Sequence, residues 1–355
     1  MPFLKRLRDQ SLNLLVMLVS LAVFFGLAER LARLGGYAPD TAQVQVFRQE
    51  FERSDFAATE LFMPSPSRVW DVRPGFVGHR TDWGTRNWVT ISINSQGRRD
   101  KEVSLQKPAG TFRIAILGDS VAFGDRVEAK DDFATQVEWT LNARSRSLRY
   151  EVLNFSVPGY GTWQELAVLR EKALNYDPDL VVLAFVMNDM FDNNQAGRQD
   201  YLNMTQVQGA AKFLREHSAF YRWMREKLLS IEAQVALRDP CASADVNFCW
   251  DTTQRLLDQV IETTRQRHVK FVLLTLPVWS QTLQPDSALE VRYQQVIAAY
   301  ARDKGIPDID LLKAFTDNRD QGLFVDDYHL TEVGHSIVMI EMIEQLDAQG
   351  LLPPR

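Results

Sequence analysis

A serine, a histidine and an aspartate stand in this sequence at places where they could act together as nucleophile, base and orienting group. Ser120 comes directly after the apolar run Ile114–Leu117 and a Gly-Asp pair. Asp326 stands three residues before His329, just ahead of a predicted helix start. A serine nucleophile needs a base, and that base needs a carboxylate that fixes its tautomer and stabilises its cation. We therefore predict nucleophilic catalysis with Ser120 as nucleophile, His329 as base and Asp326 as the orienting carboxylate.

Each of these signals also has an ordinary structural interpretation. A serine at a helix start is often no more than an N-cap, and the aspartates before His329 could simply solvate a loop ahead of a helix capped by Thr331. Among the five histidines, only His329 has a carboxylate three residues before it on a predicted loop. We expect His335, in the following helix, to be a packing residue.

Two further loops supply groups that can stabilise a negative oxygen. Gly159 lies in a Pro-Gly loop after a predicted strand, where a glycine lets the backbone N–H approach a ligand closely. Asn188 follows the next predicted strand, and its side-chain amide can donate to an oxyanion. Pro-Gly and Asn-Asp are also common turn residues. It is their occurrence in order with Ser120 and the Asp326–His329 pair that favours an oxyanion site.

Alternating strands and helices from about residue 111 onward must position these side chains. We predict strands over 113–117, 151–155, 180–186, 269–276 and 306–311, and helices over 131–143, 163–174, 252–267, 289–302 and 331–346. The third strand is continuously apolar, as expected when helices cover both faces of a sheet. This alternation predicts an α/β fold with a parallel sheet and right-handed crossovers. The carboxyl ends of its strands would then bring Ser120, Gly159 and Asn188 to one edge.

The four blocks Gly118-Asp119-Ser120, Gly159, Asn188-Asp189 and Asp326-x-x-His329 resemble the signature blocks of SGNH hydrolases, also called GDSL-type esterases. The resemblance covers about 111–346. It implies a flavodoxin-like three-layer α/β/α fold, no cofactor, the roles given above, and an oxyanion hole made of the Ser120 N–H, the Gly159 N–H and the Asn188 amide. Val186 stands where the family usually has a glycine, which predicts a narrower pocket wall near Asn188.

The N-terminus predicts a membrane anchor. Gln10 to Ala28 carries no charge and is long enough to cross a bilayer core of about 30 Å as a helix. Lys5, Arg6 and Arg8 precede it, which predicts a cytoplasmic N-terminus and an exported remainder. A cleaved signal peptide is the competing interpretation. We expect a single-pass protein of the inner (cytoplasmic) membrane, with 1–34 as stub and anchor and a periplasmic catalytic domain.

Residues 35–110 predict a small N-terminal extension of short strands. Residues 88–93 are strand-like and Asn94–Gly97 form a turn. Its tryptophans fit core packing better than a sugar-binding groove. An anchor, a tryptophan-rich extension, the Asn94-x-x-Gly97 turn and a catalytic domain are together similar to membrane-anchored SGNH proteins associated with bacterial exopolysaccharides. The chain is more distantly similar to the alginate O-acetylation proteins.

A catalytic domain over 111–349 is predicted to contain a helical insertion at 191–250. Its amphipathic part, 210–237, fits a helix docked with its polar side in water, while a lid, a partner surface and a membrane-facing helix remain open. Cys241 and Cys249 are the only cysteines and lie in a polar loop. In an oxidising compartment we expect them to form a local disulfide rather than a redox site.

Composition excludes some functions and leaves three hypotheses. The net charge of −6 and the absence of long basic runs argue against a nucleic-acid partner, and no metal-spaced Cys/His cluster is visible. The first hypothesis is a membrane-anchored serine esterase for O-acyl esters, such as acetyl groups on a surface glycan or another small ester. The second is an acyltransferase that passes the acyl group to a glycan, beside a membrane acyltransferase partner. The third is a non-catalytic polysaccharide-assembly factor.

Overall fold

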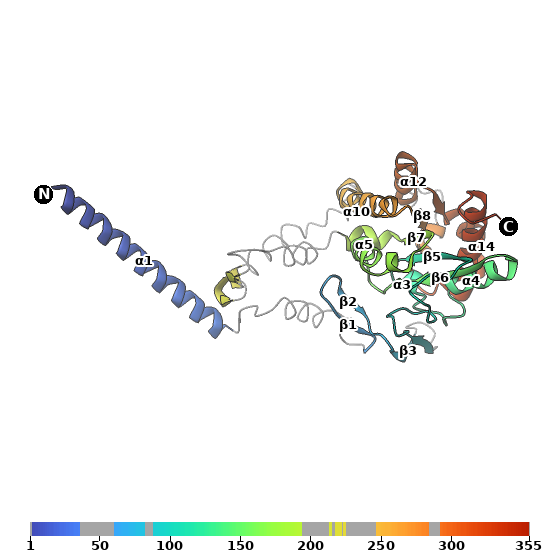
Figure 1. Cartoon of the computed structure of the whole chain (residues 1–355), viewed down its shortest axis with the longest axis horizontal. Coiled ribbons are helices and arrows are strands. Elements are labelled where there is room, and N and C mark those ends of the chain that lie inside the picture. Colours follow the sequence, from blue (N-terminus) through green and yellow to red (C-terminus); the bar gives the residue numbers. More distant parts are fainter. Residues whose placement is uncertain are drawn as a thin grey trace. The chain divides into compact units, whose positions relative to one another are not determined.

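The computed structural model describes residues 2–35, 60–81, 88–193, 213–214, 217–221, 223–224, 246–283 and 292–354. Backbone contacts divide the chain into two compact units (Figure 1). One unit comprises residues 1–50 and 196–243, and the other comprises 51–195 and 244–355. The second unit contains the sheet and all the predicted site residues.

A five-stranded sheet of parallel strands forms the centre of the second unit. Its strands are β5 (Thr111–Leu117), β6 (Arg149–Asn154), β7 (Leu180–Phe185), β8 (Lys270–Thr275) and β9 (Asp308–Asp310). Their spatial order is β6-β5-β7-β8-β9, and every neighbouring pair is parallel. In chain order this is 2-1-3-4-5, the flavodoxin-like order, whose switch point lies between the first and third strands. The predicted parallel sheet is confirmed.

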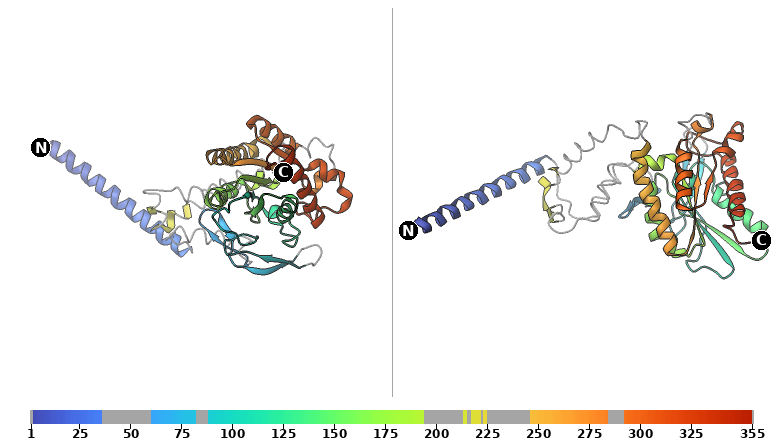
Figure 2. Two further views of the ribbon diagram at one scale, coloured as in Figure 1. Left: turned by 45° about the vertical axis from the view of Figure 1, so that its right-hand side comes forward. Right: turned by 90° about the horizontal axis from the view of Figure 1, so that it is seen from above.

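Helices cover both faces of the sheet, which gives three layers. The longer helices are α4 (Phe133–Arg144), α5 (Thr162–Glu171), α10 (Val246–Gln266), α12 (Arg292–Lys304) and α14 (Glu332–Ala348). The α4 and α14 helices pack together on one face and α5 and α10 on the other (Figure 2). Every residue of β7 is buried, because helices lie above and below this central strand. Short elements complete the unit: α3 (Ser120–Phe123), η2 (Ala173–Tyr176), α6 (Met187–Asp192), α11 (Trp279–Leu283), α13 (Leu312–Asp317) and η3 (Arg319–Gln321).

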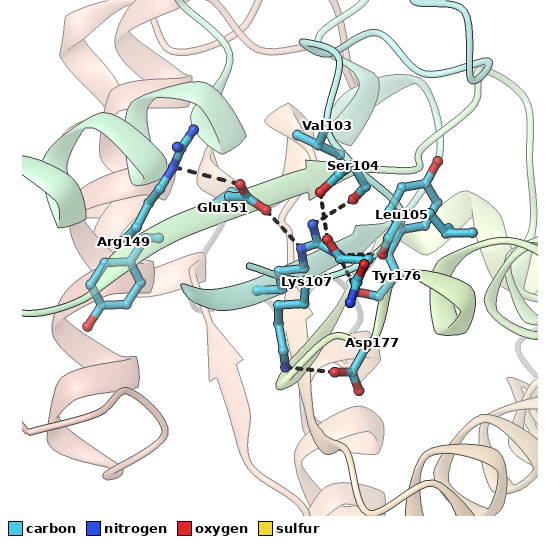
Figure 3. Close-up of polar contacts among 12 residues, drawn as sticks. Val103, Ser104, Leu105, Lys107, Arg149, Glu151, Tyr176 and Asp177 are labelled. Carbon is cyan, nitrogen blue, oxygen red and sulfur yellow. Dashed lines mark hydrogen bonds and ion pairs between the residues drawn. The ribbon is translucent and has the colours of Figure 1, made fainter. Parts of the chain in front are cut away.

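The amino end of the sheet holds a buried arginine whose donors are paired with protein groups. The Arg113 side chain is 0% exposed, and its Nε donates to Glu151 at 2.8 Å. Its two terminal nitrogens donate to the carbonyls of Ser104, Leu105 and Tyr176 at 2.7–2.9 Å (Figure 3). A buried charge of this kind is tolerated only when it is paired and hydrogen-bonded. The cluster ties the loop before β5 to β6 and η2.

Two antiparallel hairpins of the N-terminal extension pack in the second unit. They pair β1 (Phe62–Ser65) with β2 (Val69–Val72) and β3 (Val77–Thr81) with β4 (Trp88–Ser92). The Trp70 indole N–H donates to the Pro158 carbonyl at 3.1 Å, and its carbonyl accepts from the Tyr160 hydroxyl at 2.6 Å. The expected packing role of the tryptophans is confirmed at this position.

The first unit is built on α1 (Pro2–Leu34), whose apolar side chains are largely exposed. Nine apolar residues between Val16 and Leu27 are each at least 45% exposed. Among the described residues, no helix is both long and apolar enough to cross a membrane. Near its end, Glu29 accepts hydrogen bonds from the Ser218 hydroxyl and the Phe220 N–H, and Phe220 lies edge-on to two phenylalanines of α1.

Parts of the predicted insertion lie outside the described residues. Its described positions between 213 and 224 contact α1, an arrangement that the sequence analysis did not predict. The predicted disulfide also falls outside them, because Cys241 is not described and only the backbone of Cys249, in α10, is.

Candidate active site

Ser120 lies at the carboxyl end of β5 on a tight turn. Gly118 has to be a glycine, since a Cβ there would lie 2.7 Å from the Ala122 Cβ and 3.2 Å from the Ala184 carbonyl. Asp119 is the N-cap of α3, and its carboxylate accepts the Val121 N–H at 2.9 Å. Ser120 is therefore the first residue of a helical turn, as predicted, and its N–H has no acceptor within that turn.

His329 lies between Ser120 and Asp326 and contacts both. Its Nε2 is 2.9 Å from the Ser120 Oγ. Its Nδ1 is 2.8 and 2.9 Å from the two carboxylate oxygens of Asp326. The Asp326 Oδ1 also accepts the N–H groups of Tyr328 and His329, which shapes the loop that carries both side chains. The structure thus brings together three residues that are separated by up to 209 positions in the chain.

Asp326 is held in its charged form. Partial burial alone would raise its pKa, but the hydrogen bonds from the His329 ring and N–H outweigh this and hold the pKa of Asp326 well below its usual value. The Arg126 guanidinium lies 3.9 Å away and adds a nearby positive charge. A permanently charged carboxylate at Nδ1 stabilises the imidazolium that forms when Nε2 accepts a proton.

Asn188 is linked to the turn that carries Ser120 by a hydrogen bond to the Asp119 carboxylate. It is in the first turn of α6, and its Nδ2 donates to Asp119 at 2.9 Å and to Asp192 at 3.2 Å. Asp119 therefore contacts both the nucleophile turn and the predicted oxyanion donor. The Asn188 amide donates to two carboxylates in this structure, so an oxyanion would have to replace one of them as acceptor. The sequence did not reveal this.

Gly159 has a backbone conformation that favours glycine. Its φ is +77°, in the left-handed region that side chains disfavour. Its loop is held from both sides, because the Val157 N–H donates to the Gly118 carbonyl at 3.1 Å and Trp70 binds the Pro158 carbonyl. Within the described residues, neither the Gly159 N–H nor the Ser120 N–H donates to another protein group.

Two sequence expectations concern residues around the site. His335 is 1% exposed, its ring stacks on Phe133, and its Nδ1 accepts the Phe133 N–H at 3.2 Å, so its predicted packing role is confirmed. Burial and the nearby charges of Arg99 and His329 lower the pKa of His335 to about 3. Val186 is 1% exposed and belongs to the hydrophobic core, where its side chain packs among apolar neighbours.

Sequence reasoning missed a buried group of carboxylates behind Ser120, which consists of Asp119, Glu165, Asp189 and Asp192. Burial raises the pKa of each of them, with their mutual repulsion adding to the shift for Glu165 and Asp189. Burial raises the pKa of Asp192 to about 6. Two of the four belong to the recognised blocks, but Glu165 stands in α5, where no motif marks it.

Arg99 is a second residue that the sequence did not single out. Its guanidinium donates to the carbonyls of Phe123 and Gly124, at the end of α3, and to those of Thr90 and Val127. It is 2% exposed. The N-terminal extension therefore supports the nucleophile turn, and no sequence pattern indicated this contact.

The hydroxyl, imidazole and carboxylate form one chain of contacts at the carboxyl edge of a parallel sheet, and the backbone N–H groups of Ser120 and Gly159 are unengaged. This is the geometry of an α/β serine hydrolase. Among the described residues, no group of three or more His, Cys, Asp or Glu side chains is arranged to hold a metal ion.

The sequence matches the model of the GDSL-like lipase/acylhydrolase family over residues 116–337. The chain belongs to this family, within the SGNH/GDSL superfamily, and is an ester hydrolase. The match spans the sheet from β5 to α14 and includes Ser120, Gly159, Asn188, Asp326 and His329. Among curated proteins, none matches the chain significantly.

Several solved structures resemble the chain over two thirds of its length. The acetyl xylan esterase AlAXEase is 17% identical, with a TM-score of 0.45 over 66% of this chain and 98% of its own. TesA is 15% identical, with a TM-score of 0.43 over 66% and 98%. A catalytic mutant of Axe2, an acetylxylan esterase from Geobacillus stearothermophilus, is 15% identical, with a TM-score of 0.44 over 66% and 94%.

Proposed function

We propose that this protein is a serine esterase that removes O-acetyl groups from a cell-surface glycan. The observation that carries the serine mechanism is the 2.9 Å contact between the Ser120 Oγ and the His329 Nε2, with Asp326 bound to the other ring nitrogen. The acetylated glycan is the finer part of the proposal. It rests on the resemblance of the chain's organisation to exopolysaccharide-associated SGNH proteins.

The first half of the reaction forms an acyl-enzyme. The Ser120 Oγ attacks the ester carbonyl carbon while its proton passes to the His329 Nε2. The charged Asp326 stabilises the imidazolium. The tetrahedral intermediate collapses, the bond to the leaving alkoxide breaks, and His329 returns the proton to that oxygen. In the second half, water attacks the acyl-serine with His329 again as base, and acetic acid and free Ser120 result.

The negative oxygen of each intermediate accepts hydrogen bonds from two backbone N–H groups that are unengaged in the resting site, that of Ser120 after β5 and that of Gly159 after β6. The third donor, the Asn188 amide, is held by two carboxylates in the resting site. Its bond to Asp192 is the longer one, at 3.2 Å, and we assign this hydrogen to the oxyanion. The bond to Asp119 then persists and fixes the amide plane. Donors aimed at the developing charge contribute about 2.7–4 kcal/mol each in related reactions.

We also propose that the protein is anchored in the cytoplasmic membrane, with the site on the periplasmic side. The support is the uncharged run from Gln10 to Ala28, the basic residues before it, and the exposure of the apolar side chains of α1. Membrane fractionation and protease accessibility in whole cells test this. Recovery of the intact chain in the soluble cytoplasmic fraction contradicts it.

The serine mechanism is tested with p-nitrophenyl acetate and the full-length chain. We expect turnover in the wild type, a loss of about 10⁴-fold or more in Ser120→Ala and His329→Ala, and unchanged rates in Ser147→Ala, an exposed serine on another loop. Turnover that survives Ser120→Ala contradicts the mechanism. Repeating the assay with an acetylated glycan and an acceptor glycan separates release of free acetate from transfer to the acceptor.

A further inference from the structure

A mostly buried arginine, Arg126, lies next to the triad of Ser120, His329 and Asp326. Its side chain is 12% exposed, and its Nε is buried without an acceptor among the described residues. Its Nη2 lies 3.9 Å from the Asp326 Oδ2, which makes an ion pair but is too long for a hydrogen bond. Removing a guanidinium from water costs free energy that hydrogen bonds usually offset. A buried charge that lacks them is typical of functional sites.

The backbone on either side of Arg126 is tied to the turn that carries the nucleophile. The Asp125 N–H donates to the Ser120 carbonyl at 3.1 Å. On the other side, the Val127 carbonyl accepts a hydrogen bond from the buried Arg99 guanidinium at 2.6 Å. Arg126 is therefore fixed relative to the nucleophile, and it reaches the triad from a different segment than the base and its carboxylate.

The charges that face His329 come from several elements. Asp326 contacts its Nδ1, at 2.8 Å. Burial raises the pKa of Asp119, at the start of α3, and the attraction between this carboxylate and His329 opposes the rise. Burial lowers the pKa of His335, in α14, to about 3, so this second histidine is uncharged at neutral pH. Carboxylates on two elements thus favour the imidazolium, and Arg126 supplies a positive charge that opposes them.

That opposition matters because a base that is already protonated cannot accept the serine proton. A positive charge beside the carboxylate keeps the carboxylate ionised and makes the imidazolium less favourable, so the base is free at lower pH. We infer that Arg126 is a positioning residue of the triad, which acts through Asp326 and sets the lower pH limit of the esterase reaction. The inference rests on the proposed serine mechanism and adds a residue that no motif in the sequence marks.

The test follows kcat/KM on p-nitrophenyl acetate against pH in the full-length protein. The acid limb of this profile is where the base becomes protonated. Arg126→Gln keeps a polar side chain without the charge. We expect its kcat/KM to be about threefold below wild type at pH 8 and about tenfold below at pH 5.5, because the acid limb moves up by about half a pH unit. Arg126→Lys keeps the charge and should return the limb to its wild-type position. A smaller folded fraction would lower the whole profile by one factor and leave the limb in place.

The matched control is Lys130→Gln. The Lys130 Nζ also lies 3.9 Å from an aspartate, Asp131, but its side chain is 69% exposed, so the acid limb should not move in this variant.

Three results would overturn the inference: a wild-type limb in Arg126→Gln, an equal shift in Lys130→Gln, or a shift that Arg126→Lys does not reverse. If Ser120→Ala keeps its turnover, the proposed serine mechanism fails and the inference fails with it. An inactive Ser120→Ala beside an unmoved limb in Arg126→Gln removes the inference alone.

Discussion

The two ends of β5 hold buried polar clusters that are built in opposite ways. At the amino end, Arg113 pairs with Glu151 and donates to three carbonyls. At the carboxyl end, both carboxylate oxygens of Glu165, one of Asp189 and the carbonyl oxygen of Asn188 are buried without a hydrogen-bond partner among the described residues. Opposite charges meet at the first end, whereas like charges gather at the second.

The difference separates a structural cluster from a functional one. A buried charge that has an ion-pair partner and all its hydrogen bonds stabilises one arrangement of the chain. Buried polar groups without hydrogen bonds cost free energy and persist where function requires them. Burial and mutual repulsion raise the pKa values of Glu165 and Asp189, which favours their protonated forms. Asp326, by contrast, has a lowered pKa because His329 donates to it.

Removing the charge of Asp326 should produce the largest effect. Asp326→Asn keeps the shape of the side chain but no longer stabilises the imidazolium or fixes the tautomer of His329. We expect kcat to fall about 10⁴-fold. Steady-state kinetics on p-nitrophenyl acetate measure this. The neighbouring Asp327→Asn serves as the control, and equal losses in the two variants would contradict the assignment of Asp326.

Removing the arginine at the other end should damage folding instead. Arg113→Ala leaves Glu151 buried without its partner, which costs about 3–5 kcal/mol of the free energy of unfolding. The activity of each folded molecule should stay within twofold of wild type. Chemical denaturation and active-site titration measure the two quantities. Arg149→Ala is the matched control, since this exposed arginine lies 3.7 Å from the same glutamate and its loss should cost less than about 1 kcal/mol.

Truncation of Asn188 tests the third oxyanion donor. We expect Asn188→Ala to lower kcat about 10²- to 10³-fold while KM changes little, because the donor acts on the transition state. Asn175→Ala removes an exposed asparagine whose amide donates to the Glu171 carbonyl four residues earlier, and it should leave kcat unchanged. An unchanged kcat in Asn188→Ala would mean that Asp119 and Asp192 hold the amide throughout the reaction.

The smallest effect should come from Glu165→Gln, and it should be a gain in stability that depends on pH. The folded-state pKa of Glu165 is raised, chiefly by burial and then by Asp119 and Asp192. Wild type therefore keeps its full stability below the unfolded pKa and loses it as pH rises towards the folded pKa. The variant avoids this loss and should be on the order of 1–3 kcal/mol more stable at pH 8, with no gain near pH 4. Denaturation at both pH values, with the exposed Glu344→Gln as control, decides it.

The sheet and most site residues were predictable because their signals are local. A continuous apolar run such as Leu180–Phe185 predicts a buried strand, and a parallel sheet then brings successive strand ends to one edge. The Asp326-x-x-His329 spacing suffices for a hydrogen bond within one loop. Arg99 was not predictable, because its four acceptors are backbone carbonyls and nothing in the sequence marks them.

The sequence by itself determined the alternation of strands and helices, the parallel direction of the strands, and the blocks that contain Ser120, Asn188 and His329. Only the tertiary structure decided that Asp119 and Asp192 hold the Asn188 amide, that Glu165 joins them, and that Trp70 and Arg99 of the extension support the site. The physical reason is the range of the interactions. Periodicity and loop spacing act between neighbours in the chain, whereas pKa shifts and amide orientation depend on side chains that meet only after the chain has folded.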